Sequence, residues 1–317
     1  MRSTVCPFLV FGLLCPLAYP EAAPARWTAD KAKEWYVRHP WLVGCNFIPS
    51  TAINQLEMWQ ADTFDIETID RELGWAEDLG FNVVRVYLHD LAYEQDPKGF
   101  LARVDRFLGL AETHHIQALL VVFDDCWQTH PKPGKQPEPW PGVHNSGWLE
   151  SPGLPQLERY AQDAGLRARL EKYTKATLAR FRDDPRILMW DLYNEPGGWS
   201  YTRGSKPGEF ERRRTKELCL PLLNDVHAWA REVNPEQPLT TCYFGIPQVK
   251  KIGMEKSDII TFHHYGKAGD LAELIADLED RAQGRPIVCT EYMARTAGST
   301  FKTHLPIFLD LRIGAIN

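Results

Sequence analysis

The sequence lacks long blocks of like charge, and this absence limits the partners that the protein can have. Its formal net charge is only −6 at pH 7 over 317 residues. Phosphate binding requires a clustered basic face, so we exclude nucleic acid as an expected partner. Internal repeats and low-complexity segments are also missing, which favours a single globular domain.

Cysteine motifs are missing as well. The chain contains seven cysteines. Five lie outside the N-terminal segment, an odd number with no C-x-x-C pair, which argues against a disulfide framework and a structural zinc site. The H-E-x-x-H spacing of a catalytic zinc site is also absent. We therefore expect neither a metal nor another cofactor.

A hydrophobic run long enough to span a membrane is absent too. The apolar stretch from Val5 to Ala18 is too short for a span. The pattern Ala23-Pro24-Ala25 that follows predicts a signal peptide over residues 1–25, cleaved near Ala25, and hence a secreted or periplasmic protein. Cys15 leaves lipidation as an alternative.

What the sequence does contain is an alternation of short apolar runs with longer amphipathic stretches. Hydrophobic residues make up 44% of the chain, enough for a large core. The strands are expected at 41–47, 82–88, 117–124, 187–193, 239–244, 259–263, 287–290 and 311–317, and the helices at 66–79, 100–115, 166–182, 210–233 and 270–282. Eight strands with helices between them predict an α/β fold, a single (β/α)₈ TIM barrel over residues 26–317. Because no helix follows strand eight, a barrel truncated after that strand is also considered.

Two of these strands end in glutamates. Strand four ends in Glu195 and strand seven in Glu291. Active sites of such barrels lie at the carboxyl ends of the strands, so the two carboxylates are expected to face each other across the barrel mouth. This suits glycoside hydrolysis, in which one carboxyl group protonates the leaving oxygen while the other attacks. We predict that Glu195 is the acid/base and that Glu291 is a nucleophile kept ionised by Arg85 and Tyr265.

Other strand ends and loops supply candidate substrate-binding residues. Asp124 and Asp125 are included because two consecutive carboxylates after an apolar strand cannot both lie in a core. Asn194 is expected to bind the sugar 2-hydroxyl. The full predicted set is Asn46, Trp59, Arg85, Tyr87, Asp124, Asp125, Trp127, Asn194, His263 and Tyr265.

The segment WDLYNEPGG, Trp190 to Gly198, resembles the acid/base signature of clan A glycoside hydrolases, especially the cellulase family, glycoside hydrolase family 5. In that family the acid/base follows an Asn at the end of strand four, and the nucleophile ends strand seven. The resemblance extends to the strand-two Arg at Arg85 and to the strand-six His-x-Tyr at His263 and Tyr265. It implies retaining hydrolysis of β-linked glycans without a metal. The sequence departs from the family at Asp124, since the family usually has a His near this strand end.

These observations predict a secreted, monomeric retaining β-glycosidase that hydrolyses O-glycosidic bonds of a β-linked polysaccharide or oligosaccharide by double displacement. The expected partner is a carbohydrate substrate. A non-catalytic carbohydrate-binding barrel is the alternative. A barrel esterase or amidase is disfavoured because the chain has no G-x-S-x-G motif. Endo and exo action both stay open.

Overall fold

The computed structural model describes residues 1, 25–201, 211–212 and 216–317. Residues 2–24 of the predicted signal peptide lie outside this range. Among the helices of the described part, none is both long enough and apolar enough to cross a bilayer.

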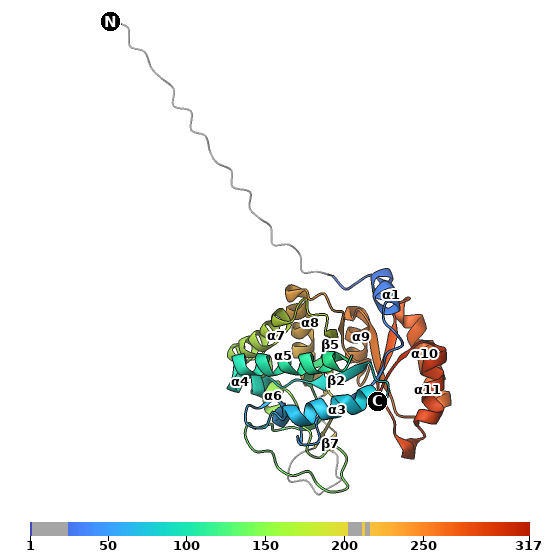
Figure 1. Cartoon of the computed structure of the whole chain (residues 1–317). Helices are drawn as coiled ribbons and strands as arrows, with labels where there is room; N and C mark the ends of the chain where they lie inside the picture. Colours follow the sequence, from blue (N-terminus) through green and yellow to red (C-terminus); the bar gives the residue numbers. More distant parts are fainter. Residues whose placement is uncertain (2–24, 202–210, 213–215) are drawn as a thin grey trace.

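Eight parallel strands form a nearly closed barrel with helices around it (Figure 1). They are β1 (Val43–Asn46), β2 (Val83–Tyr87), β3 (Gln117–Asp124), β5 (Ile187–Asn194), β8 (Leu239–Thr240), β9 (Ile260–His264), β10 (Ile287–Tyr292) and β11 (Gly314–Ile316). The strand order is β8-β5-β3-β2-β1-β11-β10-β9. Between the two outer strands, Asp258 N donates to Leu239 O and Tyr243 N donates to Thr261 O, each at 2.7 Å. The predicted TIM barrel is therefore confirmed.

The helices follow from apolar spacing and N-terminal caps. They are α1 (Ala29–Val37), α2 (Gln55–Trp59), α3 (Ile66–Asp78), α4 (Asp90–Gln95), α5 (Pro97–Thr113), α6 (Leu154–Tyr160), α7 (Ala164–Arg180), α8 (Leu220–Val233), α9 (Pro247–Lys256), α10 (Ala268–Ala282) and α11 (Phe301–Asp310), with short 3₁₀ turns η1 (Lys216–Cys219) and η2 (Arg295–Ala297). In α3, Ile69 and Leu73 are buried, and the Asp65 side chain caps the helix by accepting from Thr68 N.

Two sequence boundaries are corrected by the structure. Of the helix predicted over 210–233, residues 210 and 213–215 lie outside the described residues, and the α-helix that is described, α8, begins at Leu220, where Pro221 occupies the first turn and its fixed φ suits a helix start. The strand predicted over 311–317 is β11, which begins at Gly314 rather than at residue 311. Arg312 before it adopts a left-handed φ of 52°, which is a turn conformation.

A second, smaller sheet is built from loops at the carboxyl ends of β3 and β5. It consists of β4 (Trp127–Gln128), β6 (Trp199–Tyr201) and β7 (Glu211–Arg212), in the order β4-β6-β7. The pair β4·β6 is parallel and the pair β6·β7 is antiparallel. Because both parent loops leave the carboxyl ends of barrel strands, this sheet lies on the face where a barrel carries its active site.

The barrel interior contains a buried ion pair among apolar side chains. Side chains alternate between the two faces of a strand, so Val83, Arg85 and Tyr87 share one face of β2. The Arg85 Nη2 atom lies 2.6 Å from Asp191 Oδ2 on β5, and both side chains are fully buried. This pair connects the packed interior to the barrel mouth above it.

Candidate active site

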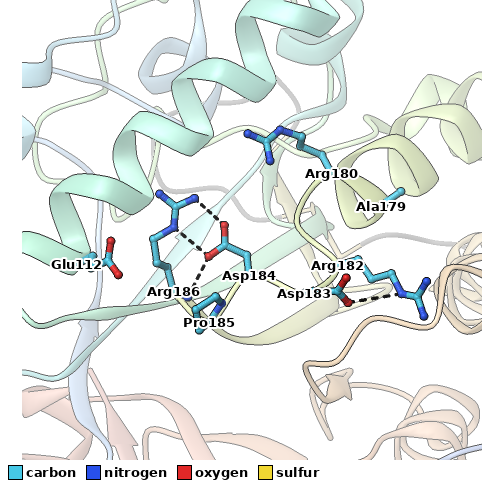
Figure 2. Close-up of a pocket in the computed structure, with 8 residues that line it drawn as sticks. All are labelled: Glu112, Ala179, Arg180, Arg182, Asp183, Asp184, Pro185 and Arg186. Atoms are coloured by element: carbon cyan, nitrogen blue, oxygen red, sulfur yellow. Dashed lines mark hydrogen bonds and ion pairs between the residues drawn. The ribbon is translucent and has the colours of Figure 1, made fainter.

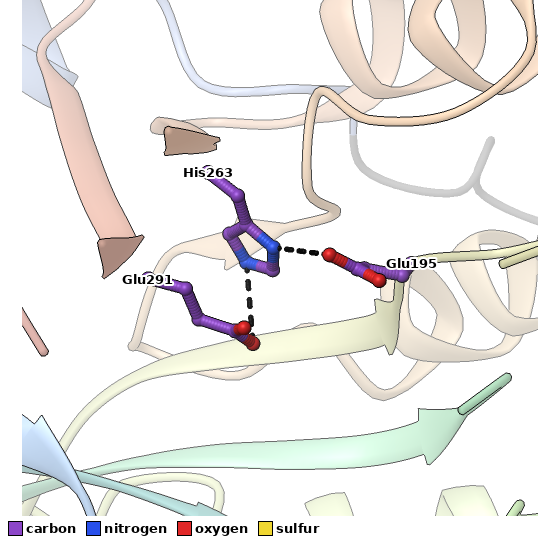
Figure 3. Close-up of side chains that lie close together, drawn as sticks. All are labelled: Glu195, His263 and Glu291. Carbon is purple, nitrogen blue, oxygen red and sulfur yellow. Dashed lines mark hydrogen bonds and ion pairs between the residues drawn. The ribbon is translucent and has the colours of Figure 1, made fainter. Parts of the chain in front are cut away.

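The two predicted catalytic carboxylates lie close together at the carboxyl ends of β5 and β10 (Figure 3). A side-chain oxygen of Glu195 and one of Glu291 lie within 4.8 Å of each other. Glu195 adopts a left-handed φ of 39°, which costs a non-glycine residue free energy and is often found at functional sites. The pairing register between β10 and β9 shifts between Cys289 and Glu291.

His263 on β9 lies between the two glutamates. Its Nδ1 atom is 2.7 Å from Glu195 Oε1, and its Nε2 atom is 3.5 Å from Glu291 Oε1. The next residue, His264, points to the other face of the strand, where its Nδ1 atom lies 3.3 Å from His304 Nε2. Only His263 of this pair therefore reaches the site.

The environment of Glu291 favours its ionised form. Tyr87 and Tyr265 each donate a phenolic hydrogen bond to it, Tyr87 at 2.8 Å to Oε1 and Tyr265 to Oε2. Arg85 Nη1 donates to the same Oε1 atom at 2.8 Å. Burial raises the pKa of Glu291, but the charges of His263 and Arg85 and the two phenol hydrogen bonds outweigh it and lower the pKa to about 2.

Arg85 forms hydrogen bonds to several side chains at the barrel mouth. Besides Asp191 and Glu291, its guanidinium donates to Asn46 Oδ1 at 2.9 Å and to Asn194 Oδ1 at 2.7 Å. Asn194 in turn donates through Nδ2 to Asp124 Oδ1 at 2.9 Å. Among the described residues, no hydrogen bond uses the second hydrogen on Asn194 Nδ2, and Asn194 lines the cavity described below.

Removing Arg85 is expected to destabilise the fold as well as the site. Arg85→Met leaves the buried Asp191 carboxylate without its cation, so we expect the free energy of unfolding to fall by about 3–5 kcal/mol. Arg281→Met, which removes an exposed pair with Asp277, should leave the free energy of unfolding nearly unchanged. Urea unfolding of both variants measures the difference, and equal losses would contradict the structural role of Arg85.

The two aspartates predicted at the end of strand three, Asp124 and Asp125, are not among the residues that line the cavity in front of the glutamates. Asp124 is buried and accepts from Trp148 Nε1 at 2.6 Å in addition to Asn194. Burial and the charges of Glu291 and Glu195 raise its pKa well above the usual range despite these hydrogen bonds. Asp125 accepts from Tyr193 OH at 2.9 Å and from the backbone N–H of Gly197 at 2.7 Å. It thus anchors the chain that follows Glu195.

A cavity of about 720 Å³ opens in front of the glutamates. Of the predicted residues it is lined by Asn46, Tyr87, Trp127, Asn194, Glu195, Tyr265 and Glu291. Trp59 is a correction. Its side chain is fully buried against Phe100 and Phe107, and its Nε1–H is donated to Tyr87 O, so it belongs to the core.

Several other residues that line this cavity had no role predicted from the sequence. They are Cys126, Phe244 and Met293 among others. Cys126 is the most informative, because its Sγ atom lies 3.2 Å from Glu195 Oε2. Its position immediately after Asp124 and Asp125 at a strand end is the signal that could have revealed it.

A second cavity, of about 470 Å³, lies at the loop between α7 and β5, at the opposite end of β5 from Glu195 (Figure 2). Each of its three arginines is paired with an aspartate. The pairs are Arg180 with Asp105 at 3.0 Å, Arg182 with Asp183 at 3.7 Å and Arg186 with Asp184 at 2.6 Å. The charges are thus paired within the protein, and we assign no ligand to this cavity.

Comparisons with known proteins identify the fold. No protein-family model matches the sequence, and no curated protein does. Among solved structures, a β-1,4-mannanase from the common sea hare Aplysia kurodai is 15% identical, with a TM-score of 0.56 over 87% of this chain and 86% of that one. An exo-β-1,4-mannosidase from Opitutaceae bacterium strain TAV5 is 16% identical, with a TM-score of 0.56 over 87% and 51%.

A GH5_18 enzyme from Bifidobacterium longum, in complex with Manβ1-4GlcNAc, is likewise 16% identical, with a TM-score of 0.56 over 87% of this chain and 67% of that one. At these identities the likeness shows the fold. That fold is consistent with the resemblance of the sequence to glycoside hydrolase family 5.

Proposed function

We propose that the protein is a retaining β-glycosidase that cleaves β-linked oligosaccharides or polysaccharides. The observation that carries the proposal is the approach of Glu195 and Glu291 oxygens to within 4.8 Å. Retaining glycosidases place their carboxyl groups about 5–5.5 Å apart, whereas inverting enzymes need about 6.5–9.5 Å to admit a water. The separation is therefore closer to that of retaining enzymes and favours direct attack by Glu291.

In the first step, the Glu291 carboxylate attacks the anomeric carbon while Glu195 donates its proton to the leaving oxygen. This breaks the glycosidic bond and forms a covalent bond between sugar and Glu291. In the second step, Glu195 takes a proton from water, which attacks the same carbon and releases Glu291. Asn194, which lines the cavity, can donate from Nδ2 to a sugar hydroxyl through the hydrogen that is not bonded to Asp124.

Sugar release from a substrate panel tests the proposal. β-Mannans and β-mannosides come first, because the fold is similar to that of β-mannanases and a β-mannosidase. β-Glucan, xylan and aryl β-glycosides complete the panel. We expect cleavage of at least one β-linked substrate with a β-configured first product. Binding of a glycan without cleavage by the folded protein would instead identify a carbohydrate-binding barrel.

The acid side of the pH profile should report on Glu291. The nucleophile must be ionised, so kcat/KM falls as the pH drops through its pKa, which is about 2. Tyr265→Phe removes a hydrogen bond to the carboxylate, so this pKa should rise by roughly one unit and the acid limb should move to higher pH. Tyr36→Phe, whose hydroxyl contacts only Arg312 O among the described hydrogen bonds, is the control. If the acid limb of the pH profile stays in place in Tyr265→Phe, Tyr265 does not stabilise the ionised form of Glu291.

A further inference from the structure

The Cys126 thiol lies at the wall of the cavity, beside the predicted acid/base. Its side chain is only 3% exposed, and it forms no disulfide. Sγ donates to Glu195 Oε2 at 3.2 Å, while the other carboxyl oxygen, Oε1, lies 2.7 Å from His263 Nδ1. The two oxygens of Glu195 therefore face different partners, an imidazole on one side and a thiol on the other.

The backbone around Cys126 is held by hydrogen bonds that fix the thiol beside Glu195. The Cys126 backbone N–H donates to Asp124 Oδ1 at 3.2 Å. The backbone of Asp125 donates to Asn194 O at 3.3 Å, which ties the end of β3 to the residue before Glu195. At Gly198, an added Cβ would lie 3.1 Å from Cys126 Sγ and 2.7 Å from Glu195 O, so this close approach requires glycine.

The thiol acts as a donor rather than as an anion. Burial, the charges of Glu195 and Asp124, and the hydrogen bond to Glu195 raise the pKa of Cys126 well above its usual range, so it keeps its proton. A thiol is a weaker donor than a hydroxyl or an N–H group. It can therefore orient Glu195 Oε2 while stabilising the ionised carboxylate only a little, which suits a group that must carry a proton and then regain it.

We propose that Cys126 is a positioning residue that orients Glu195 Oε2 through its S–H hydrogen bond. The inference rests on the acid/base role proposed for Glu195. The described ionisable groups that interact electrostatically with the Glu195 carboxyl, and that any titration must take into account, are Asp124, Cys126, Cys242, His263, Tyr265 and Glu291.

The direct test is the titration of Glu195 by ¹³C NMR in protein labelled at the glutamate carboxyl carbons. The resonance is assigned by its absence from Glu195→Gln. Cys126→Ala removes the donor, so the Glu195 midpoint should move up by roughly half a pH unit. Cys126→Ser keeps a donor, so its midpoint should lie at or below that of the parent. The control is Cys219→Ala, whose buried thiol donates to Lys216 O outside the cavity.

The alkaline limb of kcat/KM provides the second readout, because activity is lost as the general acid gives up its proton. It should move upward in Cys126→Ala and stay in place in Cys219→Ala. An unchanged Glu195 midpoint in Cys126→Ala would overturn the inference. The NMR titration requires no turnover, so it tests the Cys126 contact even if the protein cleaves no substrate. A lack of cleavage would contradict the proposed function and leave the Cys126 result to be judged separately.

Discussion

Glu291→Ala is expected to lower kcat by about 10⁴-fold or more on every β-glycoside that the parent cleaves. The variant has no atom that can attack the anomeric carbon. Arg85 and Tyr265 cannot replace it, because in the structure they only donate hydrogen bonds to the carboxylate. Steady-state rates on an aryl β-glycoside measure the loss. Glu255→Ala, an exposed glutamate paired with Lys251, should retain the parent rate.

Azide distinguishes loss of the nucleophile from general damage to the site. Shortening Glu291 leaves space beside Arg85, Tyr87 and Tyr265, whose donors favour an anion. Azide attacking from that space should restore part of the rate and give an α-glycosyl azide, with inverted configuration. A β-configured azide product, or a variant as active as the parent, would sink the role assigned to Glu291.

The strands could be predicted because their apolar runs are continuous and buried. The bounds of β3 match the predicted residues 117–124, and all of its residues except Gln117 are buried. The strand predicted over 239–244 was less accurate, since β8 covers only Leu239–Thr240. Beyond Thr240, the backbone pairs irregularly with the neighbouring strand through Tyr243 N. Hydropathy carries no information about where a ladder of hydrogen bonds stops.

The positions of the site residues were harder to predict than the strands. Strand ends were enough to bring Glu195 and Glu291 to one mouth, because parallel strands share an edge. Whether a side chain near that edge faces the cavity or the core depends on the packing of neighbouring helices. Trp59 illustrates this, since it packs against Phe100 and Phe107 of α5. The sequence likewise contained no sign that the Asp125 side chain accepts a hydrogen bond from the backbone N–H of Gly197.

The two carboxylates differ most in their hydrogen-bond donors. Glu291 is surrounded by a guanidinium and two phenols, all of which favour the ionised state of a nucleophile. Glu195 receives an imidazole contact and a thiol. Two glutamates with such different partners are suited to different roles in the same reaction, as the double-displacement mechanism requires.

Glu195→Gln is therefore expected to affect substrates unequally. The amide has no proton to donate to a leaving oxygen, so kcat on an oligosaccharide should fall by about 10²–10⁴-fold. An aryl glycoside whose phenol leaves as a stable anion needs no protonation, so its first step should be nearly unaffected. The glycosyl-enzyme on Glu291 then accumulates, because no base activates water for the second step.

Pre-steady-state release of the phenol measures this difference. A burst should appear in Glu195→Gln and be absent from Glu291→Ala. Azide should speed turnover of Glu195→Gln by attacking the glycosyl-enzyme without a base, giving a β-glycosyl azide. The alkaline limb of kcat/KM should also disappear, because the titrating acid is gone. Equal losses on both substrate types would contradict an acid/base role, since a residue that only holds the sugar in place contributes equally whatever the leaving group.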